Sequence, residues 1–137
     1  SMPGIIREAG YDPIFNPQFK PWFECNFSQI LSEEFGCTTL IRNDVKMAAT
    51  GEFYFGAGKE HKNLFYISCG VGLGSAFILN NRLHDGMHQA SGGIERFISH
   101  PSPNNQSNLE DLVSIDGIIK ISSPGFRKGY GFHRTTL

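Results

Sequence analysis

The sequence lacks the long apolar run of a membrane-spanning helix, because no stretch approaches the required ~18–20 residues. It also lacks an excess of charge of either sign, since 12 Lys and Arg stand against 13 Asp and Glu, for a formal net charge of -1. This bulk charge does not favour a free-standing nucleic-acid-binding domain, which usually carries a basic excess. The chain has only 3 cysteines and no CxxC pair, which argues against a disulfide framework and a thiolate metal site.

What remains is the composition of a globular protein. The chain has 137 residues, of which 39% are hydrophobic, enough for one compact domain with a core. The scarce cysteines and the absence of a visible signal peptide favour a cytoplasmic location. The end of the chain is the exception to the balanced charge, because Arg127, Lys128, His133 and Arg134 lie there with no acid among them. We therefore interpret residues 122–137 as a basic, flexible tail.

Hydrophobic spacing predicts a mixed α/β chain. We expect helices over residues 22–35, 43–55 and 109–119, strands at 38–41, 63–69, 75–79 and 82–83, and a polar loop at 98–108. Asn80-Asn81 suits a two-residue hairpin turn that needs positive φ. The strand at 63–69 has apolar residues on both sides, as buried strands have.

Three consecutive aromatic residues, Phe53, Tyr54 and Phe55, lie near the end of the second expected helix. One helix cannot bury all three on a single face, so we expect this chain to self-associate through exposed apolar surface.

Three features are candidates for chemistry: Asn43-Asp44 at a strand-to-helix junction, the GxGxG segment at 70–74, and the glycine-rich stretch at 86–93. Each has an ordinary explanation, as a helix cap, a tight turn and a bend. Together they fit a sugar kinase, which holds a hydroxyl against a carboxylate base and phosphates against backbone N–H groups free of side chains.

The stretch from Asn43 to Phe97 resembles the centre of the repressor/ORF/kinase (ROK) family. That family shows N-D-A, an alanine-rich helix ending in G-E, G-T-G or G-V-G, and G-x-x-G-x-A-G-E-I-G-H. Pro3-Gly4-Ile5-Ile6 resembles its P-G-I-V turn, and residues 108–114 resemble its C-L-E-x-x-x-S helix. The similarity covers residues 3–121, part of the family domain, without its amino-terminal D-x-G-G-T lobe or its long carboxy-terminal remainder. It implies a fragment of an actin-like, ribonuclease-H-like ATPase-type α/β domain, with a mixed sheet and flanking helices.

The resemblance also implies site residues. Asn43 and Asp44 would contact the sugar, with Asp44 at the catalytic-base position, and Gly70, Gly72 and Gly74 would form the phosphate loop. Glu110 matches the family's last sugar contact, but it also lies at capping-box spacing from Ser107.

Two departures weaken the kinase interpretation. The family's sugar-binding Glu is replaced by Gly93, and its His by Arg96, a guanidinium that favours an anionic ligand such as a sugar phosphate. The family's cysteine-rich zinc loop aligns with residues 98–108, which contain no cysteine. We therefore expect no metal and no cofactor, and we interpret His84, His88 and His100 as ordinary histidines.

The leading hypothesis is a ligand-sensing and oligomerisation fragment of a bacterial sugar-responsive transcriptional regulator, with a degraded sugar site and no enzymatic activity. Its partners would be a sugar or sugar phosphate effector, further copies of itself, and DNA only through a domain absent from this chain. The alternatives are a fragment of a ROK sugar kinase and a binding module without a ligand.

Overall fold

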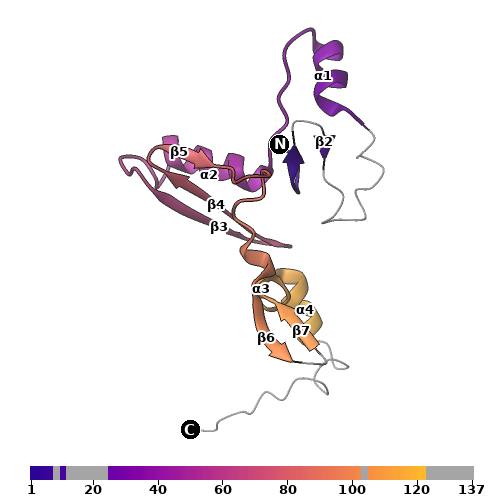
Figure 1. Ribbon diagram of the computed structural model, residues 1–137, viewed down its shortest axis with the longest axis vertical. Helices are drawn as coiled ribbons and strands as arrows, with labels where there is room; N and C mark the ends of the chain where they lie inside the picture. The colour runs from indigo at the N-terminus through magenta and orange to yellow at the C-terminus, as the bar shows by residue number, and fades with distance from the viewer. Residues whose placement is uncertain (8–9, 12–24, 103–104, 123–137) are drawn as a thin grey trace. The chain divides into compact units, whose positions relative to one another are not determined.

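The computed structural model describes residues 1–7, 10–11, 25–102 and 105–122. Two compact units make up the chain (Figure 1): the first is Ser1–Tyr66 with Ser75–Gly92, and the second is Ile67–Gly74 with Gly93–Leu137. Beyond Ser122, the predicted basic tail lies outside the described residues, as does the start of the helix expected over 22–35. Within the described residues, no helix has the length and apolar character to cross a membrane.

Helix α1, Phe27–Phe35, is capped at both ends by local sequence. The Asn26 side chain accepts a hydrogen bond from the Gln29 N–H at its start, at 3.2 Å. Gly36 ends it with a φ of 61°, the left-handed conformation in which glycine carries no steric penalty. The predicted glycine C-cap is therefore confirmed. A short pairing of β1 (Ile6–Arg7) with β2 (Gly10–Tyr11) precedes the helix.

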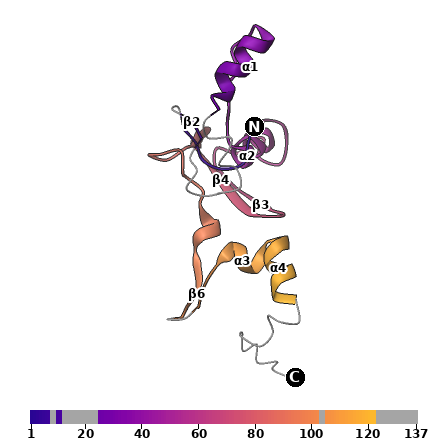
Figure 2. The same ribbon diagram turned by 90° about the vertical axis from the view of Figure 1, so that its right-hand side faces the viewer.

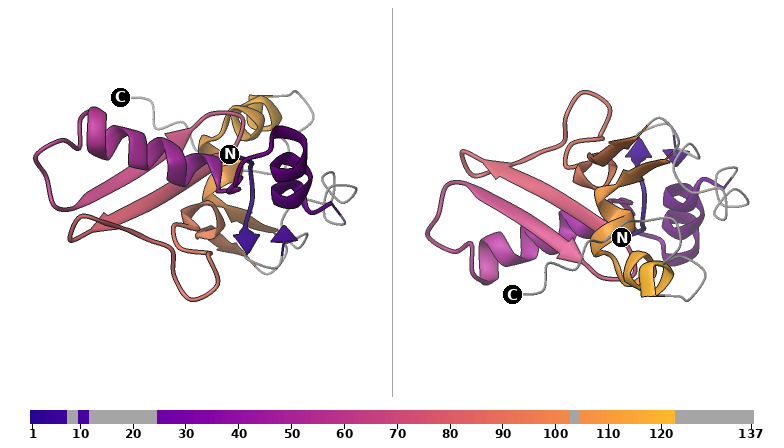
Figure 3. Two further views of the ribbon diagram at one scale, coloured as in Figure 1. Left: turned by 90° about the horizontal axis from the view of Figure 1, so that it is seen from above. Right: turned by 90° about the horizontal axis from the view of Figure 1, so that it is seen from below.

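Helix α2, Asp44–Phe55, packs on a sheet of β3 (Leu64–Cys69), β4 (Leu73–Leu79) and β5 (Arg82–His84), in that order. Figure 3 shows the helix running along this sheet. Among the described residues of the first unit, the buried apolar side chains lie at helical spacing on α2 and at alternate positions on β4; they are Ala49, Phe53, Ala76 and Ile78. Tyr54 and Phe55 remain 57% and 89% exposed, so the helix buries only one of its three consecutive aromatics, as expected.

The β4–β5 connection is the turn that the sequence predicts. Asn80 and Asn81 have φ values of 51° and 65°, and Leu79 pairs with Arg82 immediately beyond them. Asparagine tolerates positive φ better than most residues, and such turns match the twist of a hairpin. The prediction is confirmed.

The expectation of a strand at 38–41 is wrong, because the structure has none there. Hydroxyl groups of α1 take the backbone hydrogen bonds that a strand partner would need: Ser32 Oγ accepts from the Thr39 N–H at 2.9 Å, and Ser28 Oγ donates to the Thr39 carbonyl. The pairing recorded near this segment is an isolated parallel bridge between Met2 and Asn43.

The expectation that β3 is buried on both faces is also wrong. Exposure alternates along the strand, and Phe65 and Ile67 are 48% and 51% exposed. Helix α2 covers the face that carries Ala76 and Ile78. On the other face Phe65 stacks on Phe77 with ring centroids 4.5 Å apart.

The second unit contains the 3-10 helix η3 (Ile94–Arg96), the antiparallel hairpin β6 (Ile98–Ser102) and β7 (Asn105–Asn108), and helices α3 (Leu109–Val113) and α4 (Ile115–Ser122). The polar loop expected at 98–108 is thus a hairpin. The single helix expected over 109–119 is broken at Ser114 (Figure 2), whose ψ of 159° is extended and whose Oγ accepts from the Gly117 N–H at 3.0 Å. A serine that caps a new helix explains the break.

Candidate functional site

Asn43 is the N-cap of α2, and its side chain is fully engaged with its own chain. Its Oδ1 accepts from the Lys46 N–H at 2.9 Å, while its Nδ2 donates to the Gly4 carbonyl at 3.0 Å and to Asp44 Oδ1 at 3.3 Å. An amide has two N–H donors, and both are used here. Asn43 therefore orients its neighbours, and its predicted contact with a sugar remains a prediction.

Asp44 is the first residue of α2, and the suggestion that it is itself the cap is therefore wrong. Its Oδ1 accepts from the Val45 N–H at 2.8 Å and from Asn43 Nδ2. None of the described residues donates a hydrogen bond to Oδ2. The carboxylate is half-buried at a helix N-terminus, where the helix dipole stabilises negative charge. This fixed, partly unused carboxylate can accept a ligand hydroxyl.

The amino-terminal residues hold this junction in place. The Met2 N–H donates to the Arg42 carbonyl at 2.9 Å, and the Asp44 N–H donates to the Met2 carbonyl at 3.0 Å. Gly4, whose carbonyl binds Asn43, has a φ of 95°. That conformation is rare outside glycine, which gives the Pro3-Gly4 sequence its structural reason.

Lys46 is a charged residue that the sequence reasoning missed. It is 6% exposed, and its Nζ lies 2.8 Å from Asp85 Oδ1, 2.8 Å from the Gln89 carbonyl and 3.4 Å from the Asp85 carbonyl. Its position three and seven residues before Ala49 and Phe53 puts it on the buried face of α2. That spacing is a signal that could have identified it.

The glycine segment at 70–74 is a turn between β3 and β4, but its glycines are not there for positive φ. The positive-φ glycines of the described chain are Gly4, Gly36, Gly86 and Gly92. The Gly70 N–H donates to the Gly72 carbonyl at 2.9 Å, and the Gly70 carbonyl accepts from the Ile115 N–H at 2.8 Å. Gly74 lies in β4, so the phosphate-loop role of the three residues remains a prediction.

Glu110 has a different structural role from the one that its spacing predicts. The N-cap of α3 is Asn108, whose N–H donates to Asp111 Oδ2 at 3.1 Å. The predicted capping box of Ser107 and Glu110 is therefore wrong, because the box is formed by Asn108 and Asp111, one residue later. Glu110 Oε2 instead accepts from the Leu73 N–H at 3.1 Å. Strand β7 extends to Asn108 and moves the helix start beyond Ser107.

Replacing Glu110 with alanine should therefore destabilise the second unit by about 1–3 kcal/mol, because the N–H of buried Leu73 loses its acceptor. Replacing Asp111 removes only a cap contact and should cost about 0.5–1 kcal/mol. Urea unfolding of both variants measures the difference. A larger loss for Asp111→Ala would refute this assignment.

Arg96 and Gly93 occupy the ends of η3. The Arg96 guanidinium is half-exposed, with its Nε 3.5 Å from Glu95 Oε1. Gly93, the N-cap, has no side chain to offer a ligand. The structure thus brings Glu110 and the glycine turn together in the second unit, which also contains Arg96, while Asn43 and Asp44 lie together in the first.

The histidines form no cluster in the described part of the chain, where no group of three His, Cys, Asp or Glu side chains could hold a metal ion. His84 and His88 are exposed, and the side chain of His100 lies outside the described residues. The expectation of no metal site remains a prediction.

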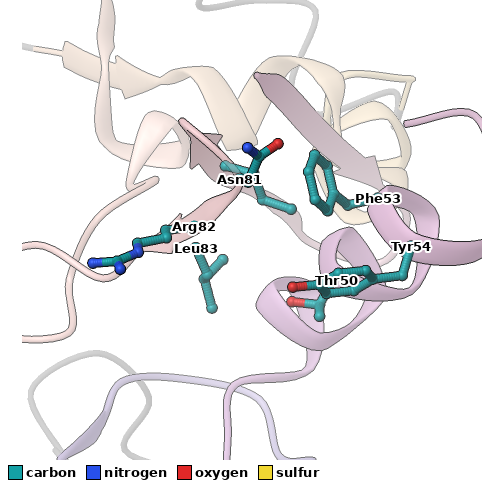
Figure 4. Close-up of a pocket in the computed structure, with 7 residues that line it drawn as sticks. Thr50, Phe53, Tyr54, Asn81, Arg82 and Leu83 are labelled. Atoms are coloured by element: carbon teal, nitrogen blue, oxygen red, sulfur yellow. The ribbon is translucent and has the colours of Figure 1, made fainter. Parts of the chain in front are cut away.

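A shallow cavity of about 270 Å³ lies in the first unit between α2 and the β4–β5 hairpin (Figure 4). Its lining is mostly apolar, with Phe53 and Ile78 from the core beside Thr50, Tyr54 and Leu83. None of the predicted site residues lines it.

A statistical model of the ROK family matches residues 1–101, nearly three quarters of the chain. The chain belongs to the ROK family. Among its relatives, the xylose repressor of Bacillus spizizenii is 33% identical over 91 residues, 66% of this chain and 23% of the repressor. The glucokinase of Halalkalibacterium halodurans is 29% identical over 130 residues, 90% of this chain and 39% of the kinase.

The solved structure of a ROK glucokinase from Streptomyces griseus, with glucose and AMPPNP, matches with a TM-score of 0.70 and 24% identity, covering 85% of this chain and 38% of that one. The likeness confirms the predicted fold, a fragment of an actin-like α/β domain. This ROK chain spans 23–39% of the length of these curated relatives, which include both repressors and kinases.

Proposed function

We propose that this ROK chain is part of the sugar-binding domain of a sugar-responsive transcriptional regulator. The observation that carries the proposal is the pair Gly93 and Arg96, which stand where the family resemblance places a Glu and a His. Gly93 offers no carboxylate to a sugar. A regulator needs only to bind its effector, whereas a kinase must also align the sugar for transfer, so lost contacts are tolerated better in a regulator.

In this proposal Asp44 is the principal sugar contact. Its Oδ1 is held by the chain, which fixes the carboxylate, and its Oδ2 receives a sugar hydroxyl. A site whose side chain is already ordered loses little conformational entropy on binding. Asn43 acts by holding Asp44, and Glu110 acts by holding the Gly70–Leu73 turn.

The family resemblance assigns Arg96 to a sugar-contacting position, and a guanidinium at that position favours an anionic effector. The Arg96 side chain is half-exposed beside Glu95, and guanidinium groups bind phosphate through charge-assisted hydrogen bonds that a neutral sugar cannot match. A sugar phosphate is therefore the favoured effector class, ahead of a neutral sugar.

The remaining features of the proposal concern the whole protein. DNA is contacted through a different domain of the regulator, which works in the cytoplasm as a homo-oligomer. The scarce cysteines support the location, and exposed Tyr54 and Phe55 support self-association.

A direct test is calorimetric titration of the chain with D-xylose, D-glucose and glucose 6-phosphate. Asp44→Ala should weaken the tightest of these by ten-fold or more, because a hydrogen bond to a charged group contributes ~1.5–3 kcal/mol. Asp116→Ala, which removes an exposed acid from the first turn of α4, is the matched control and should leave affinity unchanged. Equal losses in the two variants would contradict the role of Asp44.

A sugar kinase is the second candidate, favoured by the fixed carboxylate of Asp44 at the family's catalytic-base position. A coupled assay with ATP and either sugar separates the two. The regulator proposal expects no turnover, and turnover that Asp44→Asn abolishes would establish the kinase instead. If the chain neither binds any of these ligands nor shows turnover, the third alternative holds, a binding module without a small ligand.

A further inference from the structure

The buried ammonium of Lys46 connects α2 with the loop of residues 85–91. Its three hydrogen bonds go to the Asp85 carboxylate, the Asp85 carbonyl and the Gln89 carbonyl, so all three N–H donors are used by one loop. The side chain of Lys46 is 7% exposed and that of Asp85 is 33% exposed. The lysine of this ion pair is thus buried, whereas the aspartate is partly exposed to solvent.

The loop that Lys46 holds adopts conformations that need support. Gly86 and Gln89 have φ values of 72° and 60°, and Gln89 is a residue type that seldom adopts positive φ. The Ser91 N–H closes the loop on the Asp85 carbonyl at 3.0 Å, and Ser91 Oγ donates to the His84 carbonyl. Lys46 binds the two carbonyls on either side of this bend, at Asp85 and Gln89.

A buried ion pair contributes little net stability, since an apolar side chain of similar size often serves a core equally well. What such a pair adds is a defined geometry. Here the ammonium of Lys46 fixes the 85–91 loop to the first turn of α2, where the backbone N–H of the same residue donates to Asn43 Oδ1 and Asn43 Nδ2 donates to Asp44 Oδ1.

We propose that Lys46 is a positioning residue of the sugar site, which fixes the 85–91 loop relative to Asp44 through its ion pair with Asp85. The inference rests on the proposed function and deepens it. Ligand affinity then depends on a residue that touches no ligand. The specific chemistry is a charge-assisted contact, so an apolar replacement that preserves packing should still loosen the loop.

The test uses Lys46→Met, Asp85→Asn and the conservative Asp85→Glu, with Lys59→Met as the matched control because Lys59 is exposed. Hydrogen exchange of backbone amides is measured without ligand. In Lys46→Met and Asp85→Asn, the Ser91 amide should exchange at least ten-fold faster, while the core amide of Ile78 keeps its rate. Calorimetry with D-xylose, D-glucose and glucose 6-phosphate should show a five- to ten-fold loss of affinity that Asp85→Glu largely restores.

The outcomes separate the two proposals. Unchanged Ser91 exchange in both variants would overturn the link between Lys46 and the loop, whether or not a ligand binds. A loosened loop with unchanged affinity would overturn the positioning role and leave the sugar site intact. Failure of the unsubstituted chain to bind any of the three ligands would overturn the proposed function together with this role. If Lys46→Met does not fold, Asp85→Asn alone decides, since its side chain is partly exposed.

Discussion

Gly92→Ala should destabilise the first unit by about 3–5 kcal/mol, through overpacking and backbone strain together. Gly92 has a φ of 95°, and a Cβ at this position would lie 2.1 Å from the Ser75 carbonyl oxygen and 2.8 Å from its carbon. These are backbone atoms of β4 and cannot move aside as a side-chain end could. The Ser75 hydroxyl also donates to the Gly92 carbonyl at 2.6 Å, so the two segments are held together from both sides.

Urea unfolding followed by near-ultraviolet circular dichroism measures this loss. Gly51→Ala is the matched control, because Gly51 lies inside α2 with open space at its Cβ position. It should stabilise the helix by about 0.5–1 kcal/mol. A Gly92→Ala variant as stable as the unsubstituted chain would show that the two segments do not approach this closely.

Gly117→Ala should have the second largest effect, a loss of about 2–4 kcal/mol in the second unit by overpacking and disruption of the α3–α4 junction. Gly117 is buried in α4, and its Cβ would lie 2.3 Å from the Asp111 carbonyl oxygen and 2.8 Å from that of Glu110. Relief of the clash would push α4 away from α3, the helix that carries Glu110.

Hydrogen exchange of the Leu73 amide, bound by Glu110, is the sensitive measurement for Gly117→Ala. It should accelerate together with the global loss of stability. Gly70→Ala is the control, because open space surrounds its Cβ position and its φ is not in the left-handed region. Equal behaviour of the two variants would refute the close approach of α4 to α3.

Local sequence features predicted much of the fold. Helix α2, the glycine end of α1 and the Asn80-Asn81 turn each depend on neighbouring residues, so spacing and residue type suffice for them. The strand predicted at 38–41 was wrong because hydroxyl groups of the preceding helix α1 take the backbone hydrogen bonds of Thr39, a contact that residue type alone does not reveal. The break of the last helix at Ser114 was not predicted, because the hydrophobic spacing continues across it.

The candidate site was predicted less completely than the fold. The sequence singled out Asp44 and Glu110, but whether Glu110 caps a helix or holds Leu73 depends on where β7 ends. Lys46 went unnoticed because a lysine is normally exposed, and its partner Asp85 lies 39 residues along the chain. Long-range partners of this kind need coordinates.

The attachment of the first residues to the start of α2 sets a limit on how far the chain can be trimmed. Three hydrogen bonds depend on residues 2–4: from Met2 to Arg42, from Asp44 to Met2, and from Asn43 to Gly4. A shortened version beginning at Ile5 would release both Asn43 and the backbone of Asp44. A shortened version of this unit therefore has to keep residues 2–4, although helix α1 begins more than twenty residues later, at Phe27.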